Sequence, residues 1–489
     1  MNARVFHTRF APSPTGLLHL GNVRTALFNH LLARASGGRF LLRMEDTDAI
    51  RGEERYERAL QEDLHWLGLH WDEGPGAPGP HGPYAQSERG AIYDEYFQHL
   101  TQAGATYPCF CTEHELKLER KTQLAAGRPP RYSGRCRRLS ADEVQTRFAA
   151  GTPATLRFHV ADGRAIEFDD LVRGPQRFLS DDIGDFVIRR SDGTPAFFFS
   201  NAVDDALMDV SLVVRGEDHL ANTPRQLLLI EALGLSAPTY AHIALVTGDD
   251  GAPLSKRNGS QTVRELREHG YLPAAIVNYL ARLGHTFEDN RFMSADQLAA
   301  AFDFTRLHKA PARYDQAQLR HWQREAVAAN SDDELWKWLN EMEVSGHYVS
   351  DFVPQDLTGP FVRTVRDNIV LPADARIWAE NLFTQSGTYE HDARTAISEA
   401  GTGYFEQALD LLASGGEAFS TYGKALAAAT GTKGKSLFMP LRAALTGEKG
   451  PKAEENRWHD GPALAAIWDL LGHDRIKRRL QLARDMCQS

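Results

Sequence analysis

The sequence has few cysteines, no long apolar run and no excess of positive charge, and each shortage excludes a class of protein. Four cysteines in 489 residues cannot form the disulfide framework of a small secreted domain. No apolar run approaches the roughly 20 residues that a membrane-spanning helix needs. The N-terminal residues form no apolar signal region, so we expect a cytoplasmic protein with no membrane partner.

The overall charge is acidic, but one segment is strongly basic. The formal net charge is −10, which argues against a protein whose whole surface binds nucleic acid. Residues 117–138 nevertheless contain eight Lys or Arg against the single acid Glu119. Such a segment suits phosphate contacts. The alternative is a solvated charged segment without a partner.

The length and the hydrophobic pattern predict several domains of different class. A chain of 489 residues suggests about three domains. Residues 5–11 and 39–43 are predicted strands that flank a helix at 22–35, which makes one right-handed βαβ unit of a parallel sheet. Short strands are expected over 155–200 and a buried strand at 210–214. From about residue 260 onward the pattern is almost wholly helical.

A first motif lies in the turn between the first strand and its helix. It reads PSPTGLLHLGN over residues 12–22. The start of a helix offers unpaired N–H groups that suit phosphate, and His19 can donate further hydrogen bonds. Gly21 would let the backbone approach a ligand closely. The alternative is a Pro/Gly turn that only caps a packed helix.

A second motif lies far along the chain, at residues 252–259, and reads APLSKRNG. A glycine-flanked loop there presents two adjacent cations, Lys256 and Arg257. Such a loop suits the neutralisation of charge that develops on a pyrophosphate leaving group. Taken alone, this motif is more typical of a solvated basic turn.

Together the two motifs resemble the HIGH and KMSKS signatures of class I aminoacyl-tRNA synthetases. Three further segments narrow the resemblance to bacterial glutamyl-tRNA synthetases, namely 43–48 (RMEDTD), 201–205 (NAVDD) and 214–219 (VRGEDH). Another match at 432–442 (TKGKSLFMPLR) extends the resemblance nearly end to end. This extent argues against the shortened paralogue that modifies a tRNA nucleoside and has no anticodon-binding half.

The resemblance implies an α/β plus all-α fold with five segments. A Rossmann-type catalytic domain is split by an inserted domain that binds the tRNA acceptor arm, and helical stem-contact and anticodon-binding regions follow. The expected boundaries are 1–105 for the first catalytic half, 106–200 for the insertion, 201–260 for the second catalytic half, 261–330 for the stem-contact domain and 331–489 for the anticodon-binding region.

The implied activity is the ligation of L-glutamate to tRNA-Glu through a glutamyl-adenylate, with release of AMP and pyrophosphate. The implied cofactor is ATP with Mg²⁺, and a monomer is expected. Charging of tRNA-Gln stays open as a second specificity. Two rival functions are a nucleotidyltransferase that shares the His-x-Gly turn and a non-catalytic tRNA-binding module. The long helical C-terminal half speaks against the former, and the joint presence of the charged motif residues speaks against the latter.

The resemblance also assigns residues to ATP. His19 and Lys256 match the catalytic positions of the two signatures. The ATP-binding set is completed by Gly21, Asn22, Leu254, Ser255 and Arg257. Pro253 stands where the family usually has a lysine, which shifts the expected charge neutralisation to Lys256 and Arg257.

Charged and polar side chains are implied for glutamate. Arg9 and Arg215 match the substrate-binding arginines, because an arginine fork binds a carboxylate through two hydrogen bonds. Glu45 matches the acid that holds the α-amino group. The other matched positions are Ala11, Ser13, Asn201 and Phe197, the last in place of a tyrosine. The alternative for the two arginines is a structural ion pair with Glu45 or Glu217.

Three cysteines resemble the zinc site of some family members. They are Cys109, Cys111 and Cys136. A closed structural site needs four ligands, and Arg138 stands where the family usually has a histidine. Tyr132 or His114 are weaker candidates for the fourth position. Zinc and three reduced thiols therefore both stay open, and the expected zinc content is well under one equivalent.

For the anticodon, the run 475–484 offers only unspecific basic candidates (Arg475, Lys477, Arg478, Arg479 and Arg484).

Overall fold

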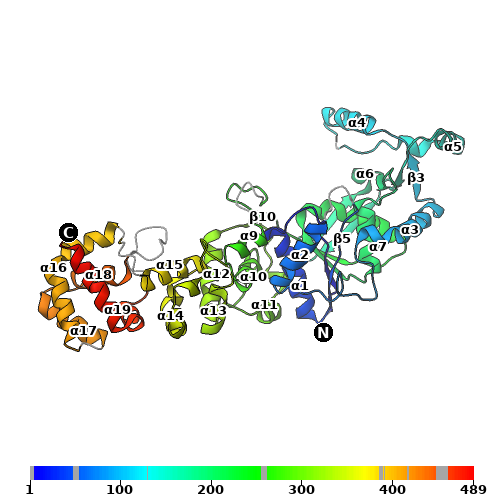
Figure 1. The fold of residues 1–489 in the computed structure, drawn as a ribbon. Helices are drawn as coiled ribbons and strands as arrows, with labels where there is room; N and C mark the ends of the chain where they lie inside the picture. The colour runs from blue at the N-terminus through cyan, green and yellow to red at the C-terminus, as the bar shows by residue number, and fades with distance from the viewer. Residues whose placement is uncertain are drawn as a thin grey trace. The chain divides into compact units, whose positions relative to one another are not determined.

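The chain folds into two compact units in the computed structural model (Figure 1). The first comprises Met1–Glu265 and Ile276–Asp315, and the second comprises Leu266–Ala275 and Gln316–Ser489. The five-segment division expected from the sequence stays a prediction. The structure describes residues 5–47, 54–128, 130–254, 261–384, 389, 391–415, 418–447 and 461–488.

The first unit begins with the predicted βαβ arrangement. Strand β1 (Thr8–Phe10) and strand β2 (Phe40–Leu42) pair in parallel, and helix α1 (Leu20–Ser36) connects them. The helix ends at Gly37, whose φ of 67° is the left-handed conformation that glycine adopts without a steric cost. The adjacent glycine permits close packing, since a Cβ on Gly38 would lie 1.9 Å from the carbonyl oxygen of Phe6.

A four-stranded sheet extends this arrangement. Its order is β6-β5-β9-β8, with parallel pairing between β8 and β9 and between β5 and β9, and antiparallel pairing between β5 and β6. The carbonyl of His7 accepts hydrogen bonds from the backbone N–H groups of Ser211 and Leu212, which holds β1 beside β8. The bounds are β5 Ala165–Asp170, β6 Gly174–Leu179, β8 Leu212–Gly216 and β9 Thr239–Ile243.

The buried strand expected at 210–214 is present but begins two residues later. Asp209 has a φ of 54°, so a turn precedes the strand. Arg215 therefore lies inside β8 rather than after it, as the register Arg215↔His242 with β9 shows. Its position is still next to the carboxyl end of a parallel strand, where α/β sheets place their ligands.

A separate antiparallel sheet follows α3 (Gly90–Gln102) and has the order β3-β4-β7. Its strands are β3 Thr106–Cys109, β4 Thr155–Phe158 and β7 Phe186–Arg189. Between β3 and β4 lie α4 (Glu113–Ala125) and α5 (Ala141–Ala149), each started by a capping box. Neither of these helices has a buried residue, so both are held by their caps and connections rather than by a core.

The remaining elements of the first unit cover the sheets. Strands β10 (Val246–Thr247) and β11 (Ala312–Arg313) form a short parallel pair. Helices α9 (Val263–Glu268) and α10 (Pro273–Arg282) span the points where the chain passes between the units. The other helices are α2 Glu54–Trp66, α6 Ser180–Ile183, α7 Phe197–Leu207, α8 Thr223–Ala232 and α11 Ala295–Ala301.

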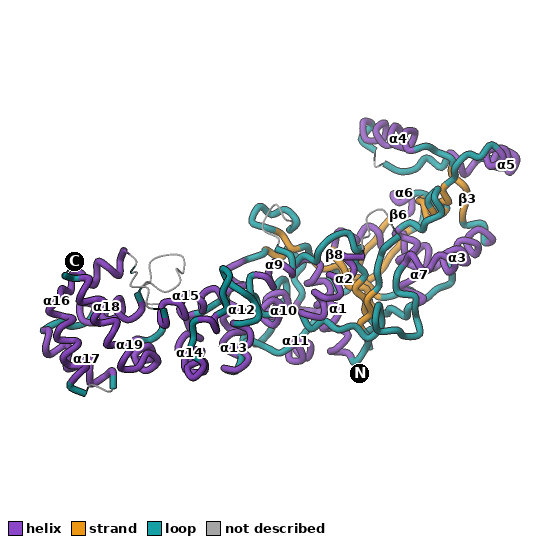
Figure 2. Tube along the Cα trace, in the orientation of Figure 1, coloured by secondary structure: helices purple, strands orange, loops and turns teal. Residues whose placement is uncertain are grey.

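The second unit is helical in all its regular elements among the described residues, as Figure 2 shows. This confirms the helical pattern expected beyond residue 260. One continuous apolar core holds the unit together and includes Trp378, Phe405 and Leu441. Its helices are α12 Gln316–Ala329, α13 Asp332–Leu339, α14 Thr358–Val365, α15 Pro372–Phe383, α16 His391–Ala413, α17 Phe419–Thr430, α18 Lys435–Thr446 and α19 Leu464–Met486. Within the described ranges, no helix combines the length and the apolarity that crossing a bilayer would require.

Candidate active site

A cavity of about 450 Å³ lies in the first unit, where β1, β8 and the start of α1 meet. Residues from distant parts of the sequence line it, and most of those singled out from the motifs are among them. These are Arg9, Ala11, Ser13, Gly21, Asn22, Glu45, Phe197, Asn201, Arg215 and Leu254. The folded chain thus brings all the residues expected to bind glutamate, and Gly21, Asn22 and Leu254 of those expected to bind ATP, around one space.

The first motif forms the turn that opens onto α1. His19 is the N-cap residue of this helix, although its side chain makes no capping hydrogen bond, and it does not line the cavity. A Cβ on Gly21 would meet no atom within 4 Å, so the backbone is open on that side. Glu45 is held next to the turn because its N–H donates to the carbonyl of Pro12 at 3.0 Å. In the second motif, Ser255, Lys256 and Arg257 lie outside the described residues.

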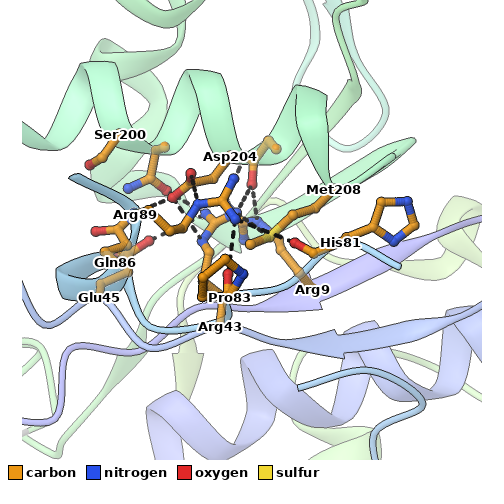
Figure 3. A network of polar contacts seen from close by, with 12 residues as sticks. Arg9, Arg43, Glu45, His81, Pro83, Gln86, Arg89, Ser200, Asp204 and Met208 are labelled. Carbon is orange, nitrogen blue, oxygen red and sulfur yellow. Dashed lines mark hydrogen bonds and ion pairs between the residues drawn. The ribbon is translucent and has the colours of Figure 1, made fainter. Parts of the chain in front are cut away.

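Beside the cavity lies a buried group of charges, which we call the ion-pair cluster (Arg43, Arg89, Asp204 and Asp205; Figure 3). Arg43 donates from Nη1 to Asp205 Oδ1 at 2.8 Å, and Arg89 donates from Nε to Asp204 Oδ1 at 2.7 Å. Burial by itself lowers the pKa of Arg43, but Asp205, Asp204 and Glu45 outweigh it and raise that pKa above its usual value. Each charge in the cluster therefore has a partner of opposite sign.

Arg9 joins this cluster from the cavity side. Its Nε and Nη2 donate to the two carboxylate oxygens of Asp205 at 3.2 and 3.4 Å. Arg9 is thus ion-paired, but its partner is neither Glu45 nor Glu217. The latter forms an ion pair with Arg173 instead. Since Arg9 also lines the cavity, the ion pair fixes the position of its side chain and leaves it accessible to a ligand there.

Arg215 differs from Arg9, Arg43 and Arg89 because neutral side chains hold it. Its Nε donates to His242 Nε2 at 3.1 Å, and its Nη2 donates to Thr223 Oγ1 and Gln226 Oε1, both at 2.8 Å. Its Nη1 is buried without a hydrogen-bond partner among the described residues. Burial lowers the pKa of Arg215 to about 10, the direction expected for a desolvated cation that lacks a close carboxylate.

Glu45 is the negative counterpart in the cavity. Its carboxylate lies 3.5 Å from Arg43 Nη2. Burial raises the pKa of Glu45 above its usual value, and the charges of Arg43 and Arg9 oppose that shift only in part. Among these groups, Arg9, Arg43 and Arg89 match Asp204, Asp205 and Glu45 in number, and Arg215 adds one positive charge. The arrangement suits a ligand that carries a cationic group and a net negative charge.

Aromatic and charged residues that the motif analysis did not assign also line the cavity. The ring of Phe197 lies against the ring of His219, with centroids 5.5 Å apart. Arg24 donates to the carbonyls of Leu283 and Ala244 from a buried position. His219 belongs to the segment 214–219 of the family resemblance, but only the fold shows that its side chain meets that of Phe197.

Cys109 at the end of β3 lies close to Cys111 and to Cys136, which follow it in the chain. Their sulfur atoms are within 4.8 Å of one another, and those of Cys111 and Cys136 are 3.5 Å apart. The hydroxyl of Tyr132 lies 3.4 Å from Cys109 Sγ and 3.5 Å from Cys111 Sγ. Burial by itself raises the pKa of Cys109, but hydrogen bonds involving Tyr132 and Arg157 lower it to about 7. His114 and Arg138 are exposed.

The charges of the basic segment are on the surface. All eight of its Lys and Arg side chains are exposed, and they lie on α4, on the loop that follows and on the 3-10 helix Arg135–Arg138. Lys117 pairs with Glu113 and Arg135 pairs with Glu115, both as exposed ion pairs. Exposed pairs of this kind stabilise a protein by at most about 1 kcal/mol, so they do not explain why the charges gather here.

The second unit has a larger cavity of about 570 Å³. It is lined by Phe383 and Tyr389 and by three of the basic residues considered for the anticodon (Arg475, Arg478 and Arg479). Arg479 donates to the carbonyls of Asn381 and Thr384, so part of its charge serves the fold. The guanidinium of Arg475 lies 5.6 Å from the centroid of the Phe383 ring.

Two family descriptions match the chain. Residues 5–321 match "tRNA synthetases class I (E and Q), catalytic domain", and residues 371–484 match "Anticodon binding domain". The first match contains every residue that lines the candidate active site, and the second contains the larger cavity of the helical unit.

Known proteins resemble the chain over nearly its whole length. It is 55% identical to glutamate–tRNA ligase 2 of Nitrosococcus oceani over 481 residues, 98% of each chain. It is 50% identical to glutamate–tRNA ligase 1 of Halorhodospira halophila over 99% of this chain and 98% of that one. The crystal structure of a glutamate tRNA ligase from Elizabethkingia meningosepticum, in complex with its amino acid, superposes with a TM-score of 0.83 at 29% identity and covers 99% of both chains. The chain therefore belongs to the class I tRNA synthetases of the glutamate and glutamine group.

Proposed function

We propose that this protein ligates L-glutamate to tRNA-Glu in two steps, with ATP and Mg²⁺ as the source of activation. In the first step the α-carboxylate of glutamate attacks the α-phosphate of ATP, which gives glutamyl-adenylate and pyrophosphate. In the second step a terminal ribose hydroxyl of the tRNA takes the glutamyl group and AMP leaves. The relatives named above are glutamate–tRNA ligases, in agreement with this proposal.

The observation that supports glutamate most strongly is the uncompensated charge of Arg215. Its Nη1 is buried without a described partner and Arg215 lines the cavity, so a ligand carboxylate that reaches Nη1 would satisfy both the charge and the donor. Glu45 would hold the α-ammonium group, and Arg9 would contribute a second cation next to it. Glutamate carries one positive and two negative groups, which is the complement of this set.

Positioning and electrostatics would provide most of the rate, because neither step needs a protein nucleophile. Asn22, Gly21 and the start of α1 would receive the triphosphate, with His19 at the helix N-cap as a further donor. Lys256 would neutralise the charge that develops on the α-phosphate and on the leaving pyrophosphate. Leu254, which lines the cavity, leads directly into the segment that contains Ser255, Lys256 and Arg257.

Lys256→Ala tests the catalytic assignment of the second motif. We expect adenylate formation to be abolished and tRNA binding to stay largely intact, because the cation acts on charge that develops in the transition state. Pyrophosphate exchange measured with tRNA present follows the first step. Near-normal turnover of the variant in that assay would remove Lys256 from the mechanism.

We also propose that zinc binds the cysteine cluster, with Tyr132 as the fourth ligand in place of the missing histidine. The cluster fits the metal because a tetrahedral zinc site needs ligands about 3.8 Å apart, and the sulfur atoms and the tyrosine hydroxyl lie near that spacing. Bound zinc would cross-link β3 to the 3-10 helix Arg135–Arg138, which carries Cys136, and so stabilise the segment between β3 and β4.

Metal analysis after dialysis tests the zinc proposal. The wild-type protein should retain one equivalent, more than the content expected from the sequence alone, because the Tyr132 hydroxyl lies beside two of the sulfurs and can complete the ligand set. Tyr132→Phe and Cys136→Ser should each retain less. Cys487→Ser is the matched control, since this cysteine lies in the helical unit and donates to the carbonyl of Ile397. A wild-type content well under one equivalent would favour three reduced thiols, the alternative raised by Arg138 at the position of the usual histidine ligand.

For tRNA, we propose that the exposed basic side chains of α4 and the following loop contact acceptor-arm phosphates. The cavity beside α19, where arginines meet Phe383 and Tyr389, suits unstacked anticodon bases. Aminoacylation of purified tRNA-Glu and tRNA-Gln side by side tests the specificity. Charging of tRNA-Glu alone supports the proposal, and charging of tRNA-Gln alone would assign the protein to the second specificity.

A further inference from the structure

The three side chains Asp170, His242 and Arg215 form a continuous buried chain that the motifs did not indicate. Asp170 Oδ2 accepts a hydrogen bond from His242 Nδ1 at 2.6 Å, and His242 Nε2 accepts one from Arg215 Nε at 3.1 Å. All three are nearly inaccessible, with exposed fractions of 3%, 0% and 5%. They come from three neighbouring strands, β5, β9 and β8, so the sheet fixes their spacing.

The direction of the hydrogen bonds fixes the protonation of the histidine. Arginine can only donate, so His242 Nε2 must carry the lone pair and Nδ1 must carry the proton. The carboxylate of Asp170 selects this tautomer by accepting the Nδ1 proton. Asp170 is itself fixed by backbone N–H groups of Val172, Arg173 and His242.

This arrangement orients Arg215 without neutralising it. A carboxylate in direct contact would hold the guanidinium equally well, as Asp205 holds Arg43, but it would neutralise the positive charge. An imidazole between the carboxylate and the guanidinium keeps the orientation and leaves the charge for a ligand. Thr223 and Gln226 hold Nη2 in the same way, through neutral oxygens.

We propose that His242 and Asp170 are positioning residues for substrate recognition, which aim Arg215 at the glutamate carboxylate through a neutral imidazole. The inference rests on the proposed glutamate-binding role of Arg215. It adds a requirement that this role alone does not make: glutamate recognition depends on a hydrogen-bond acceptor at the Nε2 position of residue 242.

A matched pair of variants tests that requirement. His242→Gln can place its amide oxygen near the Nε2 position and keep an acceptor for Arg215. His242→Asn reaches only the Nδ1 position and leaves Arg215 Nε without its acceptor. His285→Asn is the control, because His285 is another buried histidine of the same unit that lies outside the cavity and contacts the backbone of Asp303.

The readout is pyrophosphate exchange with tRNA present, with glutamate and ATP varied in turn. We expect His242→Asn to raise the KM for glutamate by about tenfold or more, as the loss of a hydrogen bond to a charged group does. The KM for ATP should stay within about twofold, and His242→Gln should recover most of the glutamate dependence. His285→Asn should leave both KM values unchanged.

Several outcomes would overturn the inference. One is an equal rise of both KM values in His242→Asn, and another is a similar change in His285→Asn, since either result indicates a structural role only. A His242→Gln enzyme no better than His242→Asn would also contradict it. The wild-type enzyme separates this failure from a failure of the proposed function, because a wild-type protein that does not activate glutamate refutes the function itself.

Discussion

The ion-pair cluster and the cavity beside it contain the same kinds of residue, but their charges are balanced differently. In the cluster, Arg43 and Arg89 meet Asp205 and Asp204 at 2.8 and 2.7 Å. In the cavity, Arg215 meets only neutral acceptors and has a buried donor without a described partner. The contrast separates arginines that hold the fold from an arginine that is left available to a ligand.

The comparison teaches that burial and charge alone do not identify a binding residue. Arg43 is the more deeply buried arginine, yet its carboxylate partners raise its pKa, whereas burial lowers that of Arg215 to about 10. A desolvated cation without a partner costs stability, and proteins retain such groups mostly at functional sites. The unmatched charge therefore supports the proposal that the substrate carboxylate binds at Arg215.

The largest expected effect comes from unbalancing the cluster. Asp204→Asn removes a charge that contacts Arg89 directly and that also accepts hydrogen bonds from Gln86 and Tyr93. Since it leaves a buried arginine uncompensated, we expect a loss of about 3–5 kcal/mol in the free energy of unfolding. Denaturant unfolding followed by circular dichroism measures this loss.

The control for that variant is Asp94→Asn, which makes the same chemical change in an exposed ion pair with Arg189. We expect the free energy of unfolding to change by less than about 1 kcal/mol there. Similar losses in the two variants would mean that the cluster is no more important to the fold than a surface pair.

The next effect is a separation in pH between the loss of glutamate binding and the loss of stability. Burial raises the pKa of Glu45, whereas Arg9 and Arg43 lower the pKa of Asp205 despite its burial. Glu45 can hold the ammonium of glutamate only as a carboxylate. Glutamate binding should therefore be complete above the pKa of Glu45 and fall as the pH drops through it, at a value above 4.5. The stability that Asp205 contributes should persist to lower pH, since its folded pKa lies below its ordinary 3.8.

Kinetics over a pH series measure this separation. The expected loss of kcat/KM for glutamate is about tenfold per pH unit below the pKa of Glu45. Glu45→Gln should recognise glutamate more weakly, and its kcat/KM for glutamate should change less with pH, because the titrating group is gone. An unchanged acid limb in that variant would assign the titration to another group.

The smallest effect is expected at Phe197, whose ring lines the cavity against His219. Phe197→Tyr adds the hydroxyl that the family resemblance led us to expect at this position. We expect the KM for glutamate to fall by a few-fold, equivalent to about 1 kcal/mol for one additional hydrogen bond. Phe198→Tyr is the control, since Phe198 does not line the cavity. A rise in the KM for glutamate would show that the ring edge has no room for an oxygen.

The sequence predicted the parts of the site that depend on local patterns. The strand, turn and helix around residues 5–35 follow hydrophobic periodicity and a glycine stop, and the structure confirms them. Glu45 and Arg215 lie in short motifs, and Arg9 was assigned through the family resemblance; all three line one cavity.

The pairing of charges could not be predicted in this way. Arg9 pairs with Asp205, which is 196 residues away in the sequence, and His242 bonds to Asp170, which is 72 residues away. No periodicity relates such positions. The first contact depends on the packing of α7, which carries Asp205, near β1, and the second depends on the order of strands in the sheet. The sequence therefore suggested Glu45 or Glu217 as partners of Arg9 and Arg215, and the fold selects Asp205 for the former and neutral side chains for the latter.

The most direct test of the central claim measures Arg215→Met in two ways. The variant should lose glutamate recognition by roughly 2–5 kcal/mol in kcat/KM, with little change in the KM for ATP. Its free energy of unfolding should fall by less than that of Asp204→Asn, because removal of a desolvated charge offsets part of the loss of its hydrogen bonds to His242, Thr223 and Gln226. A destabilised variant that still recognises glutamate normally would show that Arg215 belongs to the fold and not to the substrate.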